Sequence, residues 1–99
     1  GARRRGSRAD GRQRFRAMSA VRDVVDVLAR ALTDRPDDVR VVESPHKGTT
    51  LVELFVAPGD LGKVIGKQGR TAAALRTMAA TAAEKEGTTI TLEIRDGRP

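Results

Sequence analysis

The 99-residue sequence contains no cysteine, no tryptophan and no tyrosine, and only one histidine. Without cysteine, the chain can form neither disulfides nor thiolate metal sites. A single histidine leaves no second histidine for a metal site and no activated thiol beside it for nucleophilic catalysis. Long apolar runs and a signal-type apolar segment are also missing. We therefore expect a cytoplasmic protein that is not an enzyme and has no metal, no cofactor, no membrane contact and no small-molecule substrate.

Aromatic residues are scarce, because Phe15 and Phe55 are the only two. Several large classes of nucleic-acid-binding domain stack bases on aromatic side chains. A chain that binds nucleic acid with this composition must instead use backbone contacts, hydrogen bonds and aliphatic surface.

The formal net charge of +6 lies entirely in the first 18 residues, which hold seven arginines and one acid. Residues 19–99 hold twelve basic and twelve acidic residues, so they are neutral overall. We expect residues 1–18 to be a disordered tail, because they have too few apolar side chains to form a core. Two origins of this tail stay open: a native RNA-binding arm, or an extension upstream of a natural start at Met18, which we favour. Either would bind nucleic acid non-specifically through counterion release.

Residues 19–97 are expected to form one small domain whose elements follow the order α-β-β-α-α-β. Apolar residues at helical spacing predict a helix over 21–32, capped by Ser19. Short apolar runs between turn residues predict three strands, over 39–43, 49–57 and 88–95.

Two further helices are predicted between the second and third strands. The first is short, spans 61–65 and would be capped by Asp60. The second is rich in alanine and runs from about 70 to 86, where Gly87 ends it. Four of its residues are expected on one packed side, namely Leu75, Met78, Ala79 and Ala82.

The two helices are long enough to serve as a crossover, so the second and third strands can be parallel, while the hairpin makes the first pair antiparallel. The sequence therefore predicts an α+β fold with a three-stranded mixed sheet and three helices on one face. In the second strand, Leu51 and Phe55 face away from the core-forming residues. Phe55 is either a lone exposed apolar residue or part of a partner-binding face with Leu51, and both interpretations stay open.

The segment Gly66-Lys67-Gln68-Gly69 is the most informative local pattern, and we call it the glycine turn. Glycine lets another backbone approach closely. A helix that begins just after Gly69 would point unpaired N–H groups and its positive dipole end at the same place. The stretch from residue 61 to residue 83 has no acid and four basic residues, Lys63, Lys67, Arg70 and Arg76. This pattern predicts a site for a sugar–phosphate backbone, with Arg76 more plausibly a solvated helix charge.

A nucleotide-hydrolysing P-loop is excluded by the spacing of the same residues. That motif requires GxxxxGK followed by Ser or Thr. Here the interval from Gly62 to Gly66 is one residue short, and Gln68 stands where the hydroxyl that binds Mg²⁺ would be.

The order of elements, together with Val64-Ile65 directly before the glycine turn, resembles a type II KH domain. The stretch from Leu54 to Thr71 is similar to the small bacterial single-KH proteins of the KhpA/YlqC type. The resemblance covers about residues 19–95. It implies a groove for about four nucleotides of single-stranded RNA and a role as an RNA chaperone or post-transcriptional regulator. It also implies a homodimer, or a heterodimer with a second, larger KH-containing protein.

Carried over by position, the resemblance assigns the backbone clamp to the four residues of the glycine turn. Lys63 and Arg70 would flank the phosphate track, and Ile65 would form an apolar floor under the bases. The expected RNA-binding residues are therefore Lys63, Ile65, Gly66, Lys67, Gln68, Gly69 and Arg70. Two alternatives remain: a KH scaffold that mainly dimerises and binds RNA incidentally, and RNA binding that resides in the arginine tail.

Overall fold

The computed structural model describes residues 19–99, so the predicted disordered tail of residues 1–18 lies outside the described residues. The described chain contains three α-helices and three strands in the predicted α-β-β-α-α-β order. Three single-turn 3₁₀ helices lie between them, namely η1 (Pro36–Asp38), η2 (Pro58–Asp60) and η3 (Lys67–Gly69). The principal elements are α2 (Ala20–Leu32), β1 (Arg40–His46), β2 (Thr49–Val56), α3 (Leu61–Ile65), α4 (Arg70–Lys85) and β3 (Ile90–Asp96).

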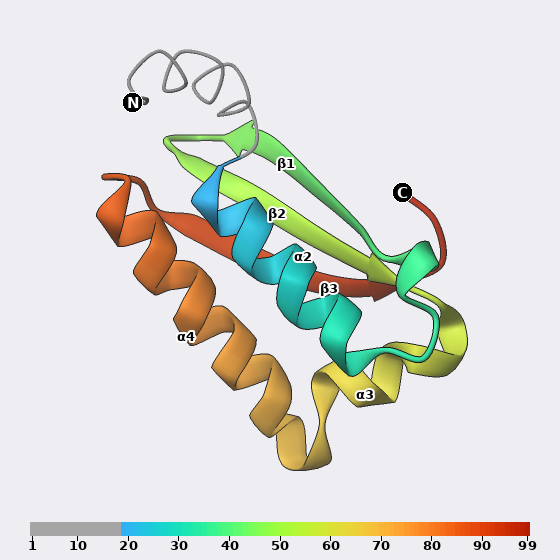
Figure 1. The fold of residues 1–99 in the computed structure, drawn as a ribbon. Coiled ribbons are helices and arrows are strands. Elements are labelled where there is room, and N and C mark those ends of the chain that lie inside the picture. The colour runs from blue at the N-terminus through green and yellow to red at the C-terminus, as the bar shows by residue number, and fades with distance from the viewer. Residues whose placement is uncertain (1–18) are drawn as a thin grey trace, which may run out of the picture.

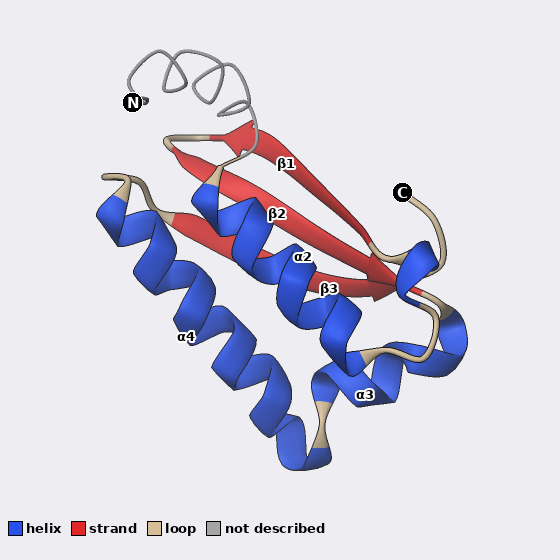
Figure 2. Cartoon of the chain, viewed as in Figure 1, coloured by secondary structure: helices blue, strands red, loops and turns tan. Residues whose placement is uncertain are grey.

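The sheet has the order β1-β2-β3, with β1 and β2 antiparallel and β2 and β3 parallel. Figures 1 and 2 show α2, α3 and α4 on the same face of this sheet. The predicted mixed sheet covered on one face is therefore confirmed. The opposite face carries no helix of the described chain, and both β1 and β3 are edge strands.

The core lies between the helices and the covered face of the sheet. It is built from valine, leucine and alanine, and the fully buried side chains include Val25, Leu54 and Val64. The predicted cap of α2 is confirmed, because the Ser19 hydroxyl accepts a hydrogen bond from the Arg22 N–H at 3.1 Å. Helix α4 ends at Lys85, within one residue of the prediction, and Gly87 follows its C-cap Glu86 with a positive φ of 73°.

Strand β1 is longer than predicted. The sequence predicts that this strand ends at residue 43, but β1 continues to His46 and Pro45 pairs with Thr50 of β2. Proline is compatible with this position because β1 is an edge strand. It pairs with β2 on one side only, so no strand on the other side needs the missing N–H. The chain reverses at Lys47 and Gly48, both at positive φ (50° and 81°).

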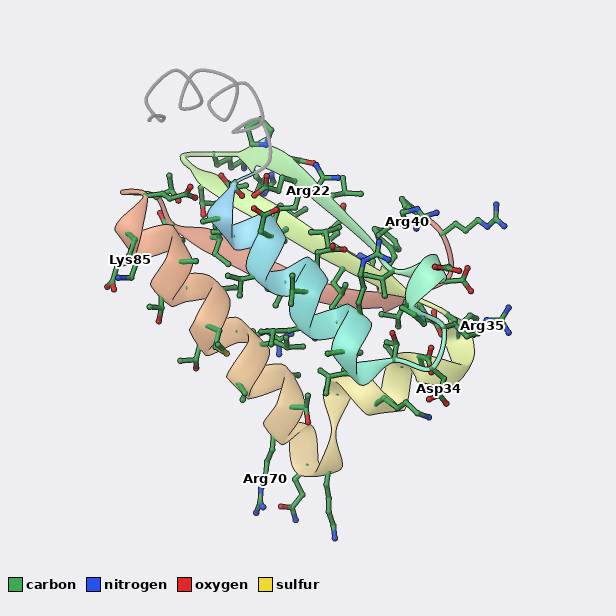
Figure 3. The ribbon with its side chains drawn as sticks, in the orientation of Figure 1. Arg22, Asp34, Arg35, Arg40, Arg70 and Lys85 are labelled. Carbon is green, nitrogen blue, oxygen red and sulfur yellow. The ribbon has the colours of Figure 1, made fainter. Side chains whose placement is uncertain are left out.

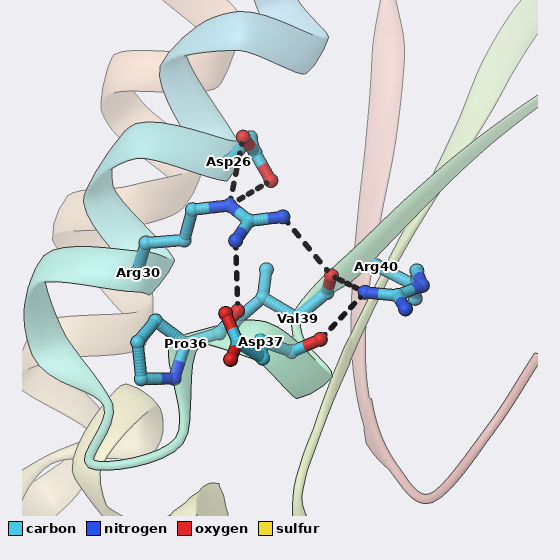
Figure 4. Close-up of polar contacts among 6 residues, drawn as sticks. All are labelled: Asp26, Arg30, Pro36, Asp37, Val39 and Arg40. Carbon is cyan, nitrogen blue, oxygen red and sulfur yellow. Dashed lines mark hydrogen bonds and ion pairs between the residues drawn. The ribbon is translucent and has the colours of Figure 1, made fainter.

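Arg30 connects the end of α2 to the start of β1 (Figure 4). Its Nε bonds the Asp26 carboxylate at 3.0 Å, and one terminal nitrogen donates to the Pro36 carbonyl at 2.9 Å. From the sheet side, Arg40 donates to the Val39 carbonyl at 2.8 Å. These contacts fix the η1 turn between α2 and β1, which the sequence did not predict as a helix.

Two predicted apolar positions differ from expectation. Met78 was predicted to pack beside Leu75, but its side chain is 49% exposed on the flank of α4 that lies next to α2. Phe55 is only 7% exposed although it lies on the helix-free face. Its cross-strand neighbours are Arg40 and Arg95, and arginine has a long aliphatic stem that can lie over apolar surface. The interpretation of Phe55 as an exposed apolar residue is therefore wrong.

Asp60 does not cap α3, as the sequence predicted, because its side chain makes no capping hydrogen bond to that helix. Its carboxylate instead accepts the backbone N–H groups of Asp34 and Arg35, at 3.2 and 3.0 Å. The side chain is 2% exposed. Asp60 therefore ties the start of α3 to the loop that follows α2, and it is a structural residue of the described chain.

Replacing Asp60 with alanine is expected to lower the free energy of unfolding by about 2–3 kcal/mol. The reason is that the N–H groups of Asp34 and Arg35 lose an acceptor that is almost fully buried. Urea unfolding measures the loss. Asp37→Ala is the matched control, since Asp37 is exposed and should shift the free energy by at most ~0.5 kcal/mol. Equal stability of the Asp60→Ala variant and the wild type would contradict this role.

Candidate nucleic-acid interface

The glycine turn joins α3 to α4 through backbone conformations that most residues avoid. Gly66 has φ 77° and ψ 171°, and Gly69 has φ 74°. Between them, Gln68 has φ 57°, in the left-handed region that non-glycine residues rarely occupy. The turn is held by bonds from the Gly66 N–H to Gly62 O at 2.9 Å and from the Gly69 N–H to Gly66 O at 3.1 Å.

Gly66 is required for a second reason, which is the closeness of Thr71. A Cβ at position 66 would lie 2.2 Å from Thr71 Oγ1 and 2.6 Å from Thr71 Cβ. Position 69 differs, because a Cβ there would meet open space and only its positive φ favours glycine. The first glycine therefore sets how closely α3 and α4 approach, and the second only lets the chain enter α4.

The polar side chains of the turn are exposed at the tip of the molecule. Lys67, Gln68 and Arg70 are all exposed, and Figure 3 shows Arg70 extending away from the body of the fold. No side chain caps the start of α4. The first-turn N–H groups and the positive end of the helix dipole thus lie beside two basic side chains. This arrangement suits a phosphate diester better than a neutral ligand.

Of the two apolar residues before the turn, Val64 is fully buried in the core and Ile65 is half-buried. Only Ile65 therefore offers aliphatic surface next to the exposed glycines. That separation follows from the short helix α3, which turns successive residues by about 100°.

Residues 61–83 contain no acidic residue, but the fold brings Asp34 next to Lys63 in this stretch. Lys63 Nζ lies 3.3 Å from a carboxylate oxygen of Asp34, in the loop after α2. The two side chains are 45% and 75% exposed, so solvent screens the pair and its contribution is at most ~1 kcal/mol. Lys63 is thus directed toward Asp34 in the unbound chain, and a phosphate could take the place of that carboxylate.

Arg76, which the sequence suggested was a solvated charge, makes a specific contact. Its Nε donates to the carbonyl of Leu92 at 3.2 Å, on the edge strand β3. Gly69 and Arg76 are seven residues apart, close to two helical turns, so they lie on the same flank of α4. From this spacing, the sequence could have placed Arg76 on the flank of α4 that continues from the glycine turn. The contact with Leu92 could not have been predicted from spacing.

The described residues give no support for a metal site or a membrane span. Within residues 19–99, no three histidine, cysteine or acidic side chains gather where they could hold a metal ion. No helix of this part of the chain is long and apolar enough to cross a membrane.

Comparison with known proteins identifies the family of the described domain. The family model described as KhpA/KhpB, KH domain, matches residues 22–94. A relative called RNA-binding protein KhpA from Aquifex aeolicus is 49% identical over 77 residues, which cover 78% of this chain and 98% of the relative. Proteins with the same name from Halalkalibacterium halodurans and Treponema pallidum are 49% and 47% identical, and the alignments cover 77% and 75% of this chain and 100% and 92% of those relatives.

Among solved structures, two of the protein Era share the fold. Aquifex aeolicus Era bound to GDP.AlF4- aligns with a TM-score of 0.58 at 21% identity, covering 79% of this chain and 31% of that one. Era in complex with MgGDPNP and nucleotides 1506–1542 of 16S ribosomal RNA aligns at 0.57 with 22% identity, covering 77% and 29%. At this identity the likeness concerns the fold alone.

Three glycine substitutions should separate the two constraints in the turn. Gly66→Ala combines positive φ with a clash and should lower the free energy of unfolding by about 3 kcal/mol or more. Gly69→Ala meets only the φ constraint and should lower it by about 1–2 kcal/mol. Gly62→Ala, with open space and an ordinary φ, should be neutral or stabilising by up to ~1 kcal/mol.

Chemical denaturation followed by circular dichroism measures the series. The order of destabilisation, with position 66 first, then 69, then 62, is the expected result. Equal effects at positions 66 and 69 would contradict the close approach of Thr71.

Proposed function

The chain belongs to the KhpA/KhpB KH-domain family, and we propose that it binds short single-stranded RNA by clamping the sugar–phosphate backbone at the glycine turn. The observation that carries the proposal is the paired left-handed turn that presents Lys67 and Gln68 at an uncapped helix start. The relatives in three bacteria are named RNA-binding proteins, which supports RNA as the ligand.

In this proposal each residue of the site has its own task. Gly66 and Gly69 let the RNA backbone lie against the turn, because no side chain stands in front of it. Lys67 and Arg70 supply charge to the phosphates, and Lys63 joins them by exchanging Asp34 for a phosphate oxygen. Ile65 provides the apolar surface against which bases can rest.

A single site of this kind gives modest affinity. Few phosphates are in reach, so the counterion-release contribution is small. The only aromatic residue of the described chain is Phe55, which is nearly buried on the opposite face of the sheet. Stacking on aromatic rings, at about 1–3 kcal/mol per base, is therefore unavailable. A weak, backbone-directed clamp fits an RNA chaperone or a post-transcriptional regulator in the cytoplasm, with no catalytic step.

A second copy of the chain is the proposed protein partner, and the surface that supports it is a groove between α2 and α4. Four of its six lining residues are apolar, and the hollow measures about 370 Å³. Its lining residues are Ala20, Val24, Met78, Thr81, Ala82 and Lys85. In a symmetric dimer the same patch serves both copies, so an apolar groove is chemically complementary to itself.

The helix-free sheet face, proposed from the sequence as the alternative interface, offers less apolar surface. Phe55 is nearly buried and Leu51 is half-buried there. Arg95 on the same face is paired with Glu53 at 2.9 Å. Association through α2 and α4 leaves the glycine turn open, so dimerisation and RNA binding are compatible.

The RNA clamp is tested with the variant Lys67→Asp/Gln68→Asp. Two carboxylates facing the phosphates should weaken binding of a labelled single-stranded RNA by about tenfold or more, an effect of on the order of 1–3 kcal/mol. Fluorescence anisotropy measures the dissociation constant. His46→Asp/Lys47→Asp is the matched control: it changes the net charge equally, but at the β1–β2 turn near the opposite end of the sheet (Figure 1).

The same two variants are then measured in a chain that lacks residues 1–17. The described core lies entirely within residues 19–99, so this shorter chain should keep its fold, which circular dichroism checks. Loss of all binding on truncation would place the activity in the arginine tail instead. Unchanged affinity of a folded Lys67→Asp/Gln68→Asp variant would show that the glycine turn is not the clamp.

The dimer surface is tested with Met78→Lys. A charge in the centre of an apolar interface costs a few kcal/mol, so the variant should be monomeric at concentrations where the wild type is dimeric. Light scattering after size exclusion measures the mass. Thr77→Lys, on an exposed position of the same helix, should leave the dimer intact. A monomeric wild type would contradict self-association and leave a second KH-containing protein as the partner.

A further inference from the structure

The contact between Arg76 and Leu92 occupies an open edge of the sheet. In the parallel pair, the Thr50 N–H donates to Thr89 O, so the backbone groups of Thr89 point toward β2. Backbone groups alternate along a strand, and those of Ile90, Leu92 and Ile94 therefore point away from β2. Because β3 is an edge strand, this outward side carries no further strand within the described chain. Arg76 is the side chain that reaches it from α4.

The flank of α4 that faces this edge is lined by small residues. Gly69, Ala73 and Ala80 lie at helical spacing on the same flank as Arg76, and no bulky side chain separates them. From Gly69 to Arg76 the helix rises by about 10 Å, which is within the span of a groove that binds about four nucleotides. A strand of RNA clamped at the glycine turn and running along this flank therefore passes Arg76.

The geometry of the Leu92 contact determines what Arg76 can still bind. The Nε–H donates to the Leu92 carbonyl, and that bond holds the guanidinium against the edge of β3. The two terminal nitrogens make no hydrogen bond to residues 19–99, and Arg76 is exposed. The end of the guanidinium thus presents two parallel N–H donors beside the edge of β3. Such a pair matches a partner with two adjacent acceptor atoms.

Unpaired RNA bases differ in whether they offer such a pair. Guanine presents O6 and N7 side by side, and cytosine presents O2 and N3. Adenine places its N6 amino donor between the acceptors N7 and N1, and uracil places its N3–H donor between two carbonyls. Adenine and uracil can therefore satisfy only one of the two donors, and they direct a donor of their own at the cation.

We propose that Arg76 is the base-reading residue of the site and selects a guanine or a cytosine from the single strand held at the glycine turn. The proposal rests on the RNA-binding function proposed above. The turn fixes the backbone without regard to sequence, and Arg76, held by the Leu92 carbonyl, supplies the base preference. In a site without aromatic rings, the guanidinium is also the planar surface on which a neighbouring base can stack.

The test uses the full chain and four labelled heptanucleotides: all uridine, and the same strand with the central base changed to guanine, cytosine or adenine. The wild type should bind the guanine or the cytosine strand about tenfold more tightly than the uridine and adenine strands, as a good bidentate contact provides. Arg76→Lys and Arg76→Gln should reduce that difference to less than about twofold. Arg22→Gln, which removes one arginine from α2 (Figure 3), should leave the preference unchanged.

The outcomes separate the roles. Arg76→Lys keeps the charge and can still donate to Leu92 O, so a stable Arg76→Lys variant that retains the full preference would overturn the proposal. Equal binding of all four strands by the wild type would overturn it as well. If Arg76→Gln is unstable, the lysine variant alone decides. If Lys67→Asp/Gln68→Asp binds RNA as the wild type does, the clamp itself fails, and that result does not depend on Arg76.

Discussion

The close approach of Gly66 to Thr71 is the constraint on which the site depends. A Cβ at position 66 would lie 2.2 Å from the threonine hydroxyl, so only glycine lets α4 begin where it does. That start brings the uncapped end of α4 next to the exposed Lys67 and Arg70. The two basic side chains, the positive end of the α4 dipole and the backbone of the glycine turn therefore lie together because of this one packing contact. The left-handed conformation of Gln68 is maintained between the two glycines by the same turn.

Helix α3 is too short to be stable alone, and the rest of the fold holds it in position. Val64 anchors it in the core. Asp60 accepts two N–H groups from the loop after α2, and Lys63 pairs with the carboxylate of Asp34 in that loop. The carboxylate of Asp60 is buried, whereas the pair of Lys63 and Asp34 is exposed and weak. The buried contact therefore fixes the direction in which the glycine turn points, and in the proposed RNA complex a phosphate replaces Asp34 beside Lys63.

The parts of the fold that depend on local pattern were predictable, and those that depend on distant contacts were not. Helix and strand periods, turn residues and the glycine spacing gave the order of elements and the mixed sheet. The pairing of Lys63 with Asp34 and of Arg76 with Leu92 joins residues far apart in the sequence, so no local pattern contains it. Met78 has the spacing of a packed residue, but its side chain lies in the groove between α2 and α4 and stays 49% exposed.

Binding of RNA at the glycine turn is tested most directly by an NMR titration of the isotope-labelled chain with a short single-stranded RNA. We expect the largest amide shifts at Lys67, Gln68 and Gly69, followed by shifts at Leu92 on the edge of β3 and at Arg76 on the facing flank of α4. The amide signals of the β1–β2 turn should not shift. Shifts confined to residues 1–18, or to the α2–α4 groove, with none at the glycine turn, would contradict a clamp at this turn.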